Sequence, residues 1–488
     1  MRKKIIAIAL SAAFAASMCA CSGDEKQEKT KYTIDATLSA DYTLTATVNC
    51  DYVNNNDVPL SELWFHLYPN AYREGATYEP IDKSHITAAY PSGRSYSKLD
   101  VKSVEVGGAS REVTIAGVDQ NVLTVPLGSA LEPGERTTVT VEYTVGLPKV
   151  RHRFGYTDKS VNLANFYPIA CVYKDGAFVA DPYYSTGDPF YSEIADYDVT
   201  LTVPEAYTGA FTGTVDKKTE AEGTVTYEVS AQNVRDFAAV LGKYEKMSGA
   251  AGKTIVNYYY YSDGNPESAL ATAIDAVKTF GEMFGDYPYP EYSVVQTSFV
   301  HGGMEYPCLS MISDGYTGDA YNDVIVHETA HQWWYGVVGN NEVKNAWLDE
   351  ALAEYSTMMF YEGKGDSYKY TFNGKRADAL SAYVLFCETY KNNGLGDTSM
   401  NRPVNEYDGD IEYSYLTYVQ GAIMLDDIRN TVGDASFKSG MKRYYEQNKY
   451  KIAEPQDLVG ALEKASGRRL DGLFDSWLSG KIKLFSNN

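Results

Sequence analysis

The stretch V-I-V-H-E-T-A-H-Q-W-W-Y-G, residues 324–336, carries two of the six histidines in a chain of 488 residues. On a helix, side chains four positions apart lie on one face, so His327 and His331 can direct two imidazole nitrogens at one ion. Glu328 follows the first histidine and reaches the same place. H-E-x-x-H on a helix is typical of a zinc centre whose glutamate is a general base. The alternative is a pair of helix histidines that are hydrogen-bonded within a core.

A catalytic zinc site with two histidines needs a third protein ligand and one open position. The segment K-N-A-W-L-D-E-A-L-A-E-Y is expected to form the next helix, and 18 residues separate its Glu350 from His331. That gap lets the first helix end, the chain turn at 336–341 and a second helix come alongside. The sequence therefore predicts one Zn²⁺ per chain with Glu350 as its third ligand, and Glu328 as the base that activates water. Glu354, one turn later, is either a hydrogen-bond partner of a zinc histidine or a solvated helix residue.

The two halves of the chain differ in the spacing at which apolar residues recur. Residues 32–248 alternate polar and apolar residues at period two, as in Y-T-L-T-A-T-V and Y-D-V-T-L-T-V, which predicts an all-β domain of the saddle or sandwich type. Residues 249–488 read as mainly helical. The expected fold class is α+β multidomain. Helices are expected over 266–284, 319–338, 346–362, 412–430, 434–448, 455–465 and 471–478.

Residues 1–20 resemble an export signal, with a basic start, an apolar run too short to span a bilayer, and small residues before Cys21. The segment S-M-C-A-C-S-G is similar to a lipobox, which makes Cys21 a candidate lipid-anchored N-terminus. Cys19 is a weaker candidate, and a plain secretory signal is the alternative. Residues 21–31 read as a flexible tether. We therefore expect an exported protein, lipid-anchored to a bacterial membrane and facing the extracytoplasmic side.

Charge and cysteine content narrow the functional classes. The net charge of −22 argues against a nucleic-acid-binding surface. The four remaining cysteines show no C-x-x-C spacing, so a zinc knuckle or a redox motif is not expected; they form one or two disulfides or remain buried thiols. They are Cys50, Cys171, Cys308 and Cys387. Nothing in the sequence indicates an oligomeric state.

H-E-x-x-H followed after 18 residues by the glutamate of W-L-x-E resembles the gluzincin peptidases of the aminopeptidase N and leukotriene A hydrolase family. The segments L-W-F-H-L-Y-P-N, V-R-D-F-A-A-V-L-G and D-S-W-L are also similar to bacterial members. The resemblance implies a β-saddle domain followed by a thermolysin-like catalytic domain. It implies a zinc aminopeptidase that acts on peptides. Many members continue into a helical C-terminal domain, which is not expected here because the chain ends at Asn488, soon after D-S-W-L.

The family's G-x-M-E-N segment is matched by Gly302, Gly303, Met304 and Glu305, with Tyr306 in place of the asparagine. In the family this strand binds the substrate, and its glutamate binds the free α-amine. The resemblance therefore implies that Glu305 sets the exopeptidase register, since a fixed carboxylate favours a cationic N-terminus.

The family also places a tyrosine in Y-x-K-G, whose hydroxyl hydrogen-bonds the oxyanion of the tetrahedral intermediate. Here the segment is Y-V-Q-G and begins at Tyr418, with glutamine in place of lysine. Tyr413 lies nearby, and Tyr415 is a rival at helical spacing. A packing role in a tyrosine-rich chain is the alternative.

The remaining histidines receive no role from the sequence. His66, His85 and His152 are scattered through the β region without ligand spacing, and His301 is left outside the predicted site. Two rival functions stay open: a zinc metallo-endopeptidase with an open cleft, and a catalytically inactive binding lipoprotein.

Overall fold

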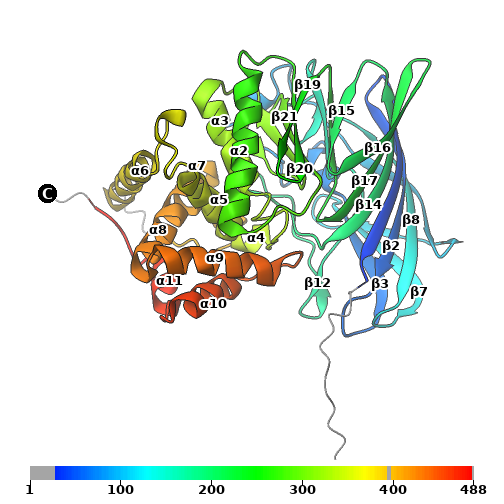
Figure 1. The fold of residues 1–488 in the computed structure, drawn as a ribbon. Helices are drawn as coiled ribbons and strands as arrows, with labels where there is room; N and C mark the ends of the chain where they lie inside the picture. Colours follow the sequence, from blue (N-terminus) through cyan, green and yellow to red (C-terminus); the bar gives the residue numbers. More distant parts are fainter. Residues whose placement is uncertain (1–27, 393–396, 486–488) are drawn as a thin grey trace, which may run out of the picture.

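Strands fill the first half of the chain and helices most of the second half, and the two halves lie side by side (Figure 1). The structure, a computed structural model, describes residues 28–392 and 397–485. The predicted fold class, an all-β region followed by a mainly helical region, is confirmed. The predicted signal, the lipidation site Cys21 and most of the predicted tether lie outside the described residues, although β1 already begins at Thr30.

An eight-stranded sheet forms the outer wall of the β half. Its strands alternate buried and exposed residues, as β1 does along its whole length, so one face packs on the core and the other faces solvent. β1 runs parallel to β14 and antiparallel to β2. In spatial order the strands are β16 (Thr214–Ala221), β17 (Thr224–Val234), β14 (Ala195–Pro204), β1 (Thr30–Leu38), β2 (Thr43–Val53), β8 (Arg136–Gly146), β4 (Leu99–Val106) and β5 (Ala109–Ser110).

Smaller sheets complete the β half and reach toward the helices. One has the order β15 (Thr208–Phe211), β18 (Ala238–Gly242), β10 (Ser160–Ala164) and β9 (Phe154–Tyr156). Another has the order β11 (Ile169–Ala170), β3 (Leu60–His66), β7 (Val122–Leu131) and β6 (Thr114–Ala116). β12 (Tyr173–Lys174) pairs with β13 (Ala177–Phe178). The strands of β10 and β18 are buried along their whole length, as expected for strands covered on both faces.

A five-stranded mixed sheet opens the catalytic half, and the predicted boundary at residue 248 falls within its first strand. The order is β19 (Glu245–Ala251), β20 (Thr254–Tyr260), β21 (Glu291–Thr297), β23 (Leu309–Ser313) and β22 (Gly303–Met304). β20, β21 and β23 are parallel, and β22 pairs antiparallel to β23 at the edge. This edge strand is the segment that carries Gly303 and Met304.

Helices make up the rest of the catalytic half, with α3 and α5 packed against each other beside the mixed sheet (Figure 1). The longer helices are α2 (Pro266–Phe284), α3 (Gly318–Ala330), α5 (Trp347–Phe360), α6 (Phe372–Asn392), α8 (Gly421–Val432), α9 (Asp434–Asn448), α10 (Pro455–Ser466) and α11 (Asp471–Leu478). Shorter ones are α1 (Ile86–Ala89), α4 (Glu342–Asn345), α7 (Gly409–Tyr413), the 3₁₀ turns η1 (Tyr68–Tyr72), η2 (Gly365–Ser367) and η3 (Val404–Glu406), and the π-helix η4 (Ser414–Gln420). No helix among the described residues has both the length and the apolar character needed to cross a bilayer.

One helix prediction needs correction, and one helix was not predicted. The helix expected over 319–338 ends at Ala330, because the next residues fold back: the Gly336 N–H donates to the His331 carbonyl, and Tyr335 adopts a φ of 110°. The helix α6 was not predicted, since its sequence F-N-G-K-R-A-D-A-L-S-A mixes polar residues and a glycine without an apolar stripe.

A buried arginine joins the two halves. Arg235, which follows β17, is 2% exposed and donates to the carbonyls of Ser192 at 3.1 Å, Tyr335 at 2.8 Å and Lys451 at 2.5 Å. The guanidinium group thus provides hydrogen-bond donors for backbone carbonyls that have no partner in a sheet. It also holds the turn after α3 against the β half. The four cysteines within the described residues are buried free thiols.

Candidate metal centre and substrate cleft

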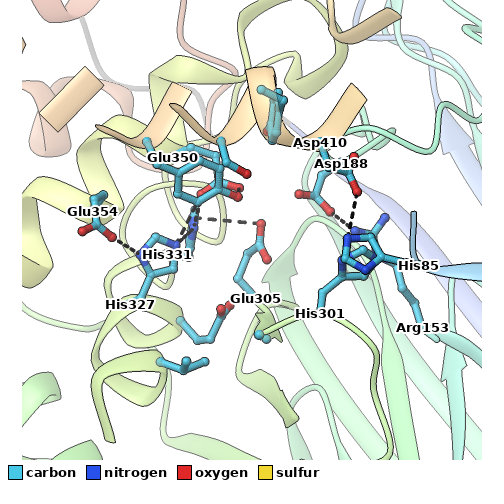
Figure 2. A pocket seen from close by; sticks show the side chains of 18 of the residues that line it. His85, Arg153, Asp188, His301, Glu305, His327, His331, Glu350, Glu354 and Asp410 are labelled. Carbon is cyan, nitrogen blue, oxygen red and sulfur yellow. Dashed lines mark hydrogen bonds and ion pairs between the residues drawn. The ribbon is translucent and has the colours of Figure 1, made fainter. Parts of the chain in front are cut away.

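A cleft of about 330 Å³ lies between the β half and the helices and contains the predicted site (Figure 2). Side chains from both halves line it. From the β half come His85, Arg153 and Asp188, and from the catalytic half come Gly302, Gly303, Glu305, His327, Glu328, His331, Glu350, Glu354, Asp410, Tyr413 and Tyr418.

Three of these side chains direct one atom each at a common point. Nε2 of His331 lies 3.2 Å from Nε2 of His327 and 3.1 Å from Oε2 of Glu350, and the third edge, His327 to Glu350, is 3.3 Å. His327 lies in the last turn of α3. His331 caps the C-terminus of this helix with a helical backbone conformation, and its N–H donates to the His327 carbonyl. Glu350 lies in the first turn of α5.

These three distances fit a tetrahedral Zn²⁺ centre. Ligand bonds of about 2.0–2.2 Å in tetrahedral geometry separate the ligand atoms by roughly 3.3 Å. The second ring nitrogens are already used: Nδ1 of His331 lies 3.0 Å from the Trp334 carbonyl, and Nδ1 of His327 lies 3.3 Å from Oε2 of Glu354. Protons on both Nδ1 atoms leave the Nε2 lone pairs facing the common point. Two histidines and one carboxylate are a donor set that suits a catalytic zinc. His331 and Glu350 are buried, and His327 is partly buried.

The field inside this group favours positive charge. Burial lowers the pKa of His327, but hydrogen bonds to Glu350 and Glu354 raise it to about 10. Burial raises the pKa of Glu350, and the two histidines then hold it well below its usual range. The surroundings of the two imidazoles therefore favour a cation at the common point.

Glu328 faces the cleft from the same helix turn. It is 5% exposed, and its Oε2 atom has no hydrogen-bond partner within the described residues. Burial raises its pKa to about 7 against the opposing effect of His327 and His331. The absence of a side chain at Gly303 makes room for it, because a Cβ there would lie 2.3 Å from Glu328 Oε1. A carboxyl with a pKa near neutrality can both take and give a proton.

Glu305 ends the edge strand inside the cleft. It is 4% exposed, its Oε1 lies 4.0 Å from Nδ1 of His331, and that oxygen has no hydrogen-bond partner within the described residues. Carboxylate oxygens of Asp188, Glu305 and Glu350 lie within 4.8 Å of one another. Tyr306 points away from the cleft and donates to Asn165 of the β half at 2.9 Å. Tyr306, which stands where the family has asparagine, does not line the cleft.

The three candidate tyrosines take different places. The Tyr418 hydroxyl donates to Oε1 of Glu350, the oxygen turned away from the histidines, and its ring stacks on His327 at 5.7 Å. Tyr413 also lines the cleft, and its buried hydroxyl has no partner among the described residues. Tyr415 instead stacks on Phe386 at 4.9 Å and does not line the cleft.

Sequence reasoning missed part of the cleft. Asp188, which forms an ion pair with Arg153 at 2.5 Å, comes from an irregular segment of the β half without any motif. His85 and His301, to which the sequence assigned no role, pack against each other on one side of the cleft next to Asp410 (Figure 2). No periodicity or spacing links these residues, because separate loops and the short helix α7 bring them together.

Comparison with known proteins agrees with this geometry. Residues 268–477 match the model of the peptidase family M1 domain. The chain is 26% identical over 310 residues to aminopeptidase N of Streptomyces lividans, covering 58% of this chain and 35% of that protein. It is 24% identical over 398 residues to the puromycin-sensitive aminopeptidase of Caenorhabditis elegans, covering 76% of this chain and 41% of that protein. The chain thus spans less than half the length of these curated relatives.

A solved structure of similar length shares the fold. The M1 zinc metallopeptidase of Deinococcus radiodurans superposes with a TM-score of 0.66 at 17% identity, covering 94% of this chain and 95% of that chain. A two-domain M1 zinc metallopeptidase bound to L-arginine gives the same TM-score of 0.66. Together with the H-E-x-x-H ligand set and Glu350, these matches support a relation to the gluzincin family of aminopeptidase N: residues 268–477 resemble the peptidase family M1 domain, and the solved structures share the fold.

Proposed function

We propose that this protein is a zinc-dependent aminopeptidase that hydrolyses N-terminal residues from peptides. The observation that carries the proposal is the buried, unpartnered carboxylate oxygen of Glu305 beside the ligand triad, with Asp188 within 4.8 Å. Two carboxylates beside the triad favour a cationic group, and a peptide's free α-amine is such a group. The aminopeptidase names of the relatives support the same activity.

His327, His331 and Glu350 would hold the zinc ion. When bound, Zn²⁺ supplies Lewis acidity, which polarises a peptide carbonyl and lowers the pKa of water. Glu354 fixes the tautomer and orientation of His327 through their 3.3 Å contact, and Lys375 at 3.8 Å keeps Glu354 ionised. Burial raises the pKa of Glu354, but Lys375 and His327 lower it to about 2.

Glu328 moves the proton. Its carboxylate takes a proton from the attacking water and then gives it to the leaving amine nitrogen, so the glutamate ends the cycle as it began. A pKa of about 7 suits both steps near neutral pH. The free Oε2 atom is the acceptor that the first step needs.

Glu305 positions the substrate, and the glycine-rich edge strand lets it approach. Gly302 and Gly303 bring peptide backbone without side chains to the wall of the cleft, whereas Met304 is buried and does not line it. Carboxylate oxygens of Glu305 and Asp188 lie within 4.8 Å of one of Glu350, so an α-amine held there would place the first peptide bond at the triad.

Tyr418 provides the oxyanion donor in this proposal. Its hydroxyl already lies at the triad, where it donates to Glu350, and rotation toward the cleft would transfer that hydrogen bond to the developing negative charge. Tyr413 is the second hydroxyl in the cleft, and Tyr415 is excluded by its position.

We further propose that the enzyme works outside the cytoplasmic membrane, anchored by lipid at Cys21. The basic and apolar run before S-M-C-A-C-S-G supports this location. Replacing Cys21 with alanine should release the protein from the membrane fraction. Retention of the Cys21→Ala protein in that fraction would refute the lipid anchor.

The activity is tested with aminoacyl-p-nitroanilides and matched peptides whose N-termini are free or acetylated, using the purified protein spanning residues 22–488. We expect hydrolysis of free-amine substrates alone, lost on chelation and restored by Zn²⁺. The Glu328→Gln protein should retain zinc and lose hydrolysis. Equal cleavage of acetylated peptides would identify an endopeptidase, and no cleavage by the zinc-loaded protein would favour a binding lipoprotein.

A further inference from the structure

The cleft contains a second group with the donor set of the triad. His85, His301 and Asp410 each offer one ligand atom, and these atoms lie within 4.8 Å of one another. Nε2 of His85 lies 3.4 Å from Oδ2 of Asp410 (Figure 2). We propose that these three residues form a second site for a divalent transition-metal ion such as Zn²⁺, separate from the catalytic centre. Two imidazoles and a carboxylate suit Zn²⁺, Co²⁺, Ni²⁺ and Cu²⁺.

His301 is oriented by packing, and its nitrogens remain free to bind. Its ring contacts His85 at 5.0 Å, His152 at 5.6 Å and Phe299 at 5.5 Å between centroids. Neither ring nitrogen of His301 makes a hydrogen bond or ion pair within residues 28–392 and 397–485. Its neighbour His152 is satisfied elsewhere, with Nδ1 2.5 Å from the Tyr72 hydroxyl. An imidazole fixed in place with its lone pair facing the cleft is preorganised for a metal ion.

The charges around this group favour a cation. A second carboxylate, that of Asp82, lies near Asp410. Its Oδ2 is 3.7 Å from the position that a Cβ on the neighbouring Gly409 would take. Arg153 is the nearby positive charge, and Asp188 neutralises it through a 2.5 Å ion pair. Two carboxylates are thus left to balance a divalent ion.

The second site would bind more weakly than the triad. The side chains of His85 and Asp410 are 37% and 18% exposed, whereas those of Glu350 and His331 are 5% and 1% exposed. Exposed ligands are less fixed and better hydrated, so a metal ion would fill the catalytic centre first.

An ion at this site would bridge the two halves of the molecule. His85 precedes α1 in the β half, His301 precedes the edge strand β22, and Asp410 lies in α7. The ion would narrow the cleft and place positive charge near Asp188 and Glu305. If the proposed aminopeptidase function holds, excess metal should therefore inhibit hydrolysis by opposing the substrate's ammonium group. The site itself does not depend on that function.

The test is metal stoichiometry, measured by equilibrium dialysis of the protein spanning residues 22–488 against rising Zn²⁺, followed by metal analysis. We expect two Zn²⁺ ions per wild-type chain and one per chain for His85→Gln and for Asp410→Asn. Because loss of a partner behind a ligand already costs about 10- to 100-fold in metal affinity, loss of a ligand should cost at least as much. Asp82→Asn is the control: it removes one negative charge beside Asp410 but no ligand, and should weaken binding of the second ion less than Asp410→Asn does.

Several results would overturn the proposal. They are one Zn²⁺ per wild-type chain, two in both ligand variants, or loss of the second ion in Asp82→Asn as complete as in Asp410→Asn. Thermal unfolding in chelator verifies that each variant is folded. Hydrolysis at excess Zn²⁺ is measured in parallel: wild type should be inhibited and His85→Gln resistant, whereas equal inhibition would refute the inhibitory role. If the protein hydrolyses no peptide, the stoichiometry still decides whether the site exists.

Discussion

Replacing Glu305 with glutamine tests how the cleft selects a free N-terminus. The substitution keeps the shape of the side chain and removes its charge. Because Glu305 is 4% exposed and one of its oxygens has no partner among the described residues, an ammonium group bound there would be desolvated. A hydrogen bond to a charged group is worth about 1.5–3 kcal/mol. Since about 1.4 kcal/mol is a tenfold change, kcat/KM for free-amine substrates should fall roughly 10- to 150-fold.

The loss should appear mainly in KM. The α-amine contacts Glu305 in both the bound substrate and the transition state, so removing the contact weakens both equally. Initial rates on an aminoacyl-p-nitroanilide series give kcat and KM separately. Because the Asp188 carboxylate remains in the Glu305→Gln protein, the fall in kcat/KM should stay within the range given above.

Glu342 supplies the matched control. It is 1% exposed, both of its carboxylate oxygens lack partners among the described residues, and it does not line the cleft. Burial raises its pKa well above the usual range, and glutamine keeps the shape of its side chain. Glu342→Gln should leave kcat and KM unchanged. An unchanged KM in Glu305→Gln, or the same loss in both variants, would refute the role of Glu305.

Three further predictions concern zinc affinity, packing and acid stability. Glu354→Gln should weaken zinc binding about 10- to 100-fold by competition assay, because His327 loses its charged partner; unchanged affinity would contradict this. Gly421→Ala should destabilise the fold by about 1–3 kcal/mol in denaturant titration, because the new Cβ would lie 2.4 Å from the Cβ of Ala351. Gly460→Ala, where a Cβ would meet nothing within 4 Å, should instead stabilise the fold by roughly 0.5–1 kcal/mol. Equal effects of the two substitutions would refute the packing argument. Burial lowers the pKa of His66 to about 4, so the unfolded chain takes up a proton at a higher pH than the folded chain does. The free energy of unfolding should therefore fall by about 3 kcal/mol as the pH drops from about 6.5 to 4. A His66→Phe protein with the same acid dependence would contradict this prediction.

The triad could be predicted from the sequence because local geometry determines it. Helical spacing places His327 and His331 on one face, and the short connection to α5 brings Glu350 alongside. Glu305 and Tyr418 needed the family resemblance, since no local rule places an edge strand or a π-helix beside α3. The period-two alternation identified the β half for the same local reason.

The other wall of the cleft could not be predicted. Asp188, His85 and Asp410 come from loops and a short helix whose positions depend on packing between the two halves. The end of α3 was also missed, because backbone hydrogen bonds after His331 and the positive φ of Tyr335 leave no clear trace in a run of aromatic residues. Tertiary contacts determine these features.

The most direct test of the central claim is a time course of one unblocked peptide of about ten residues, digested by the zinc-loaded protein and followed by mass spectrometry. A buried carboxylate anchor beside the ligand triad predicts a ladder in which each product has lost one more residue from its N-terminus. Fragments that arise from internal bonds at the earliest times would contradict the aminopeptidase assignment.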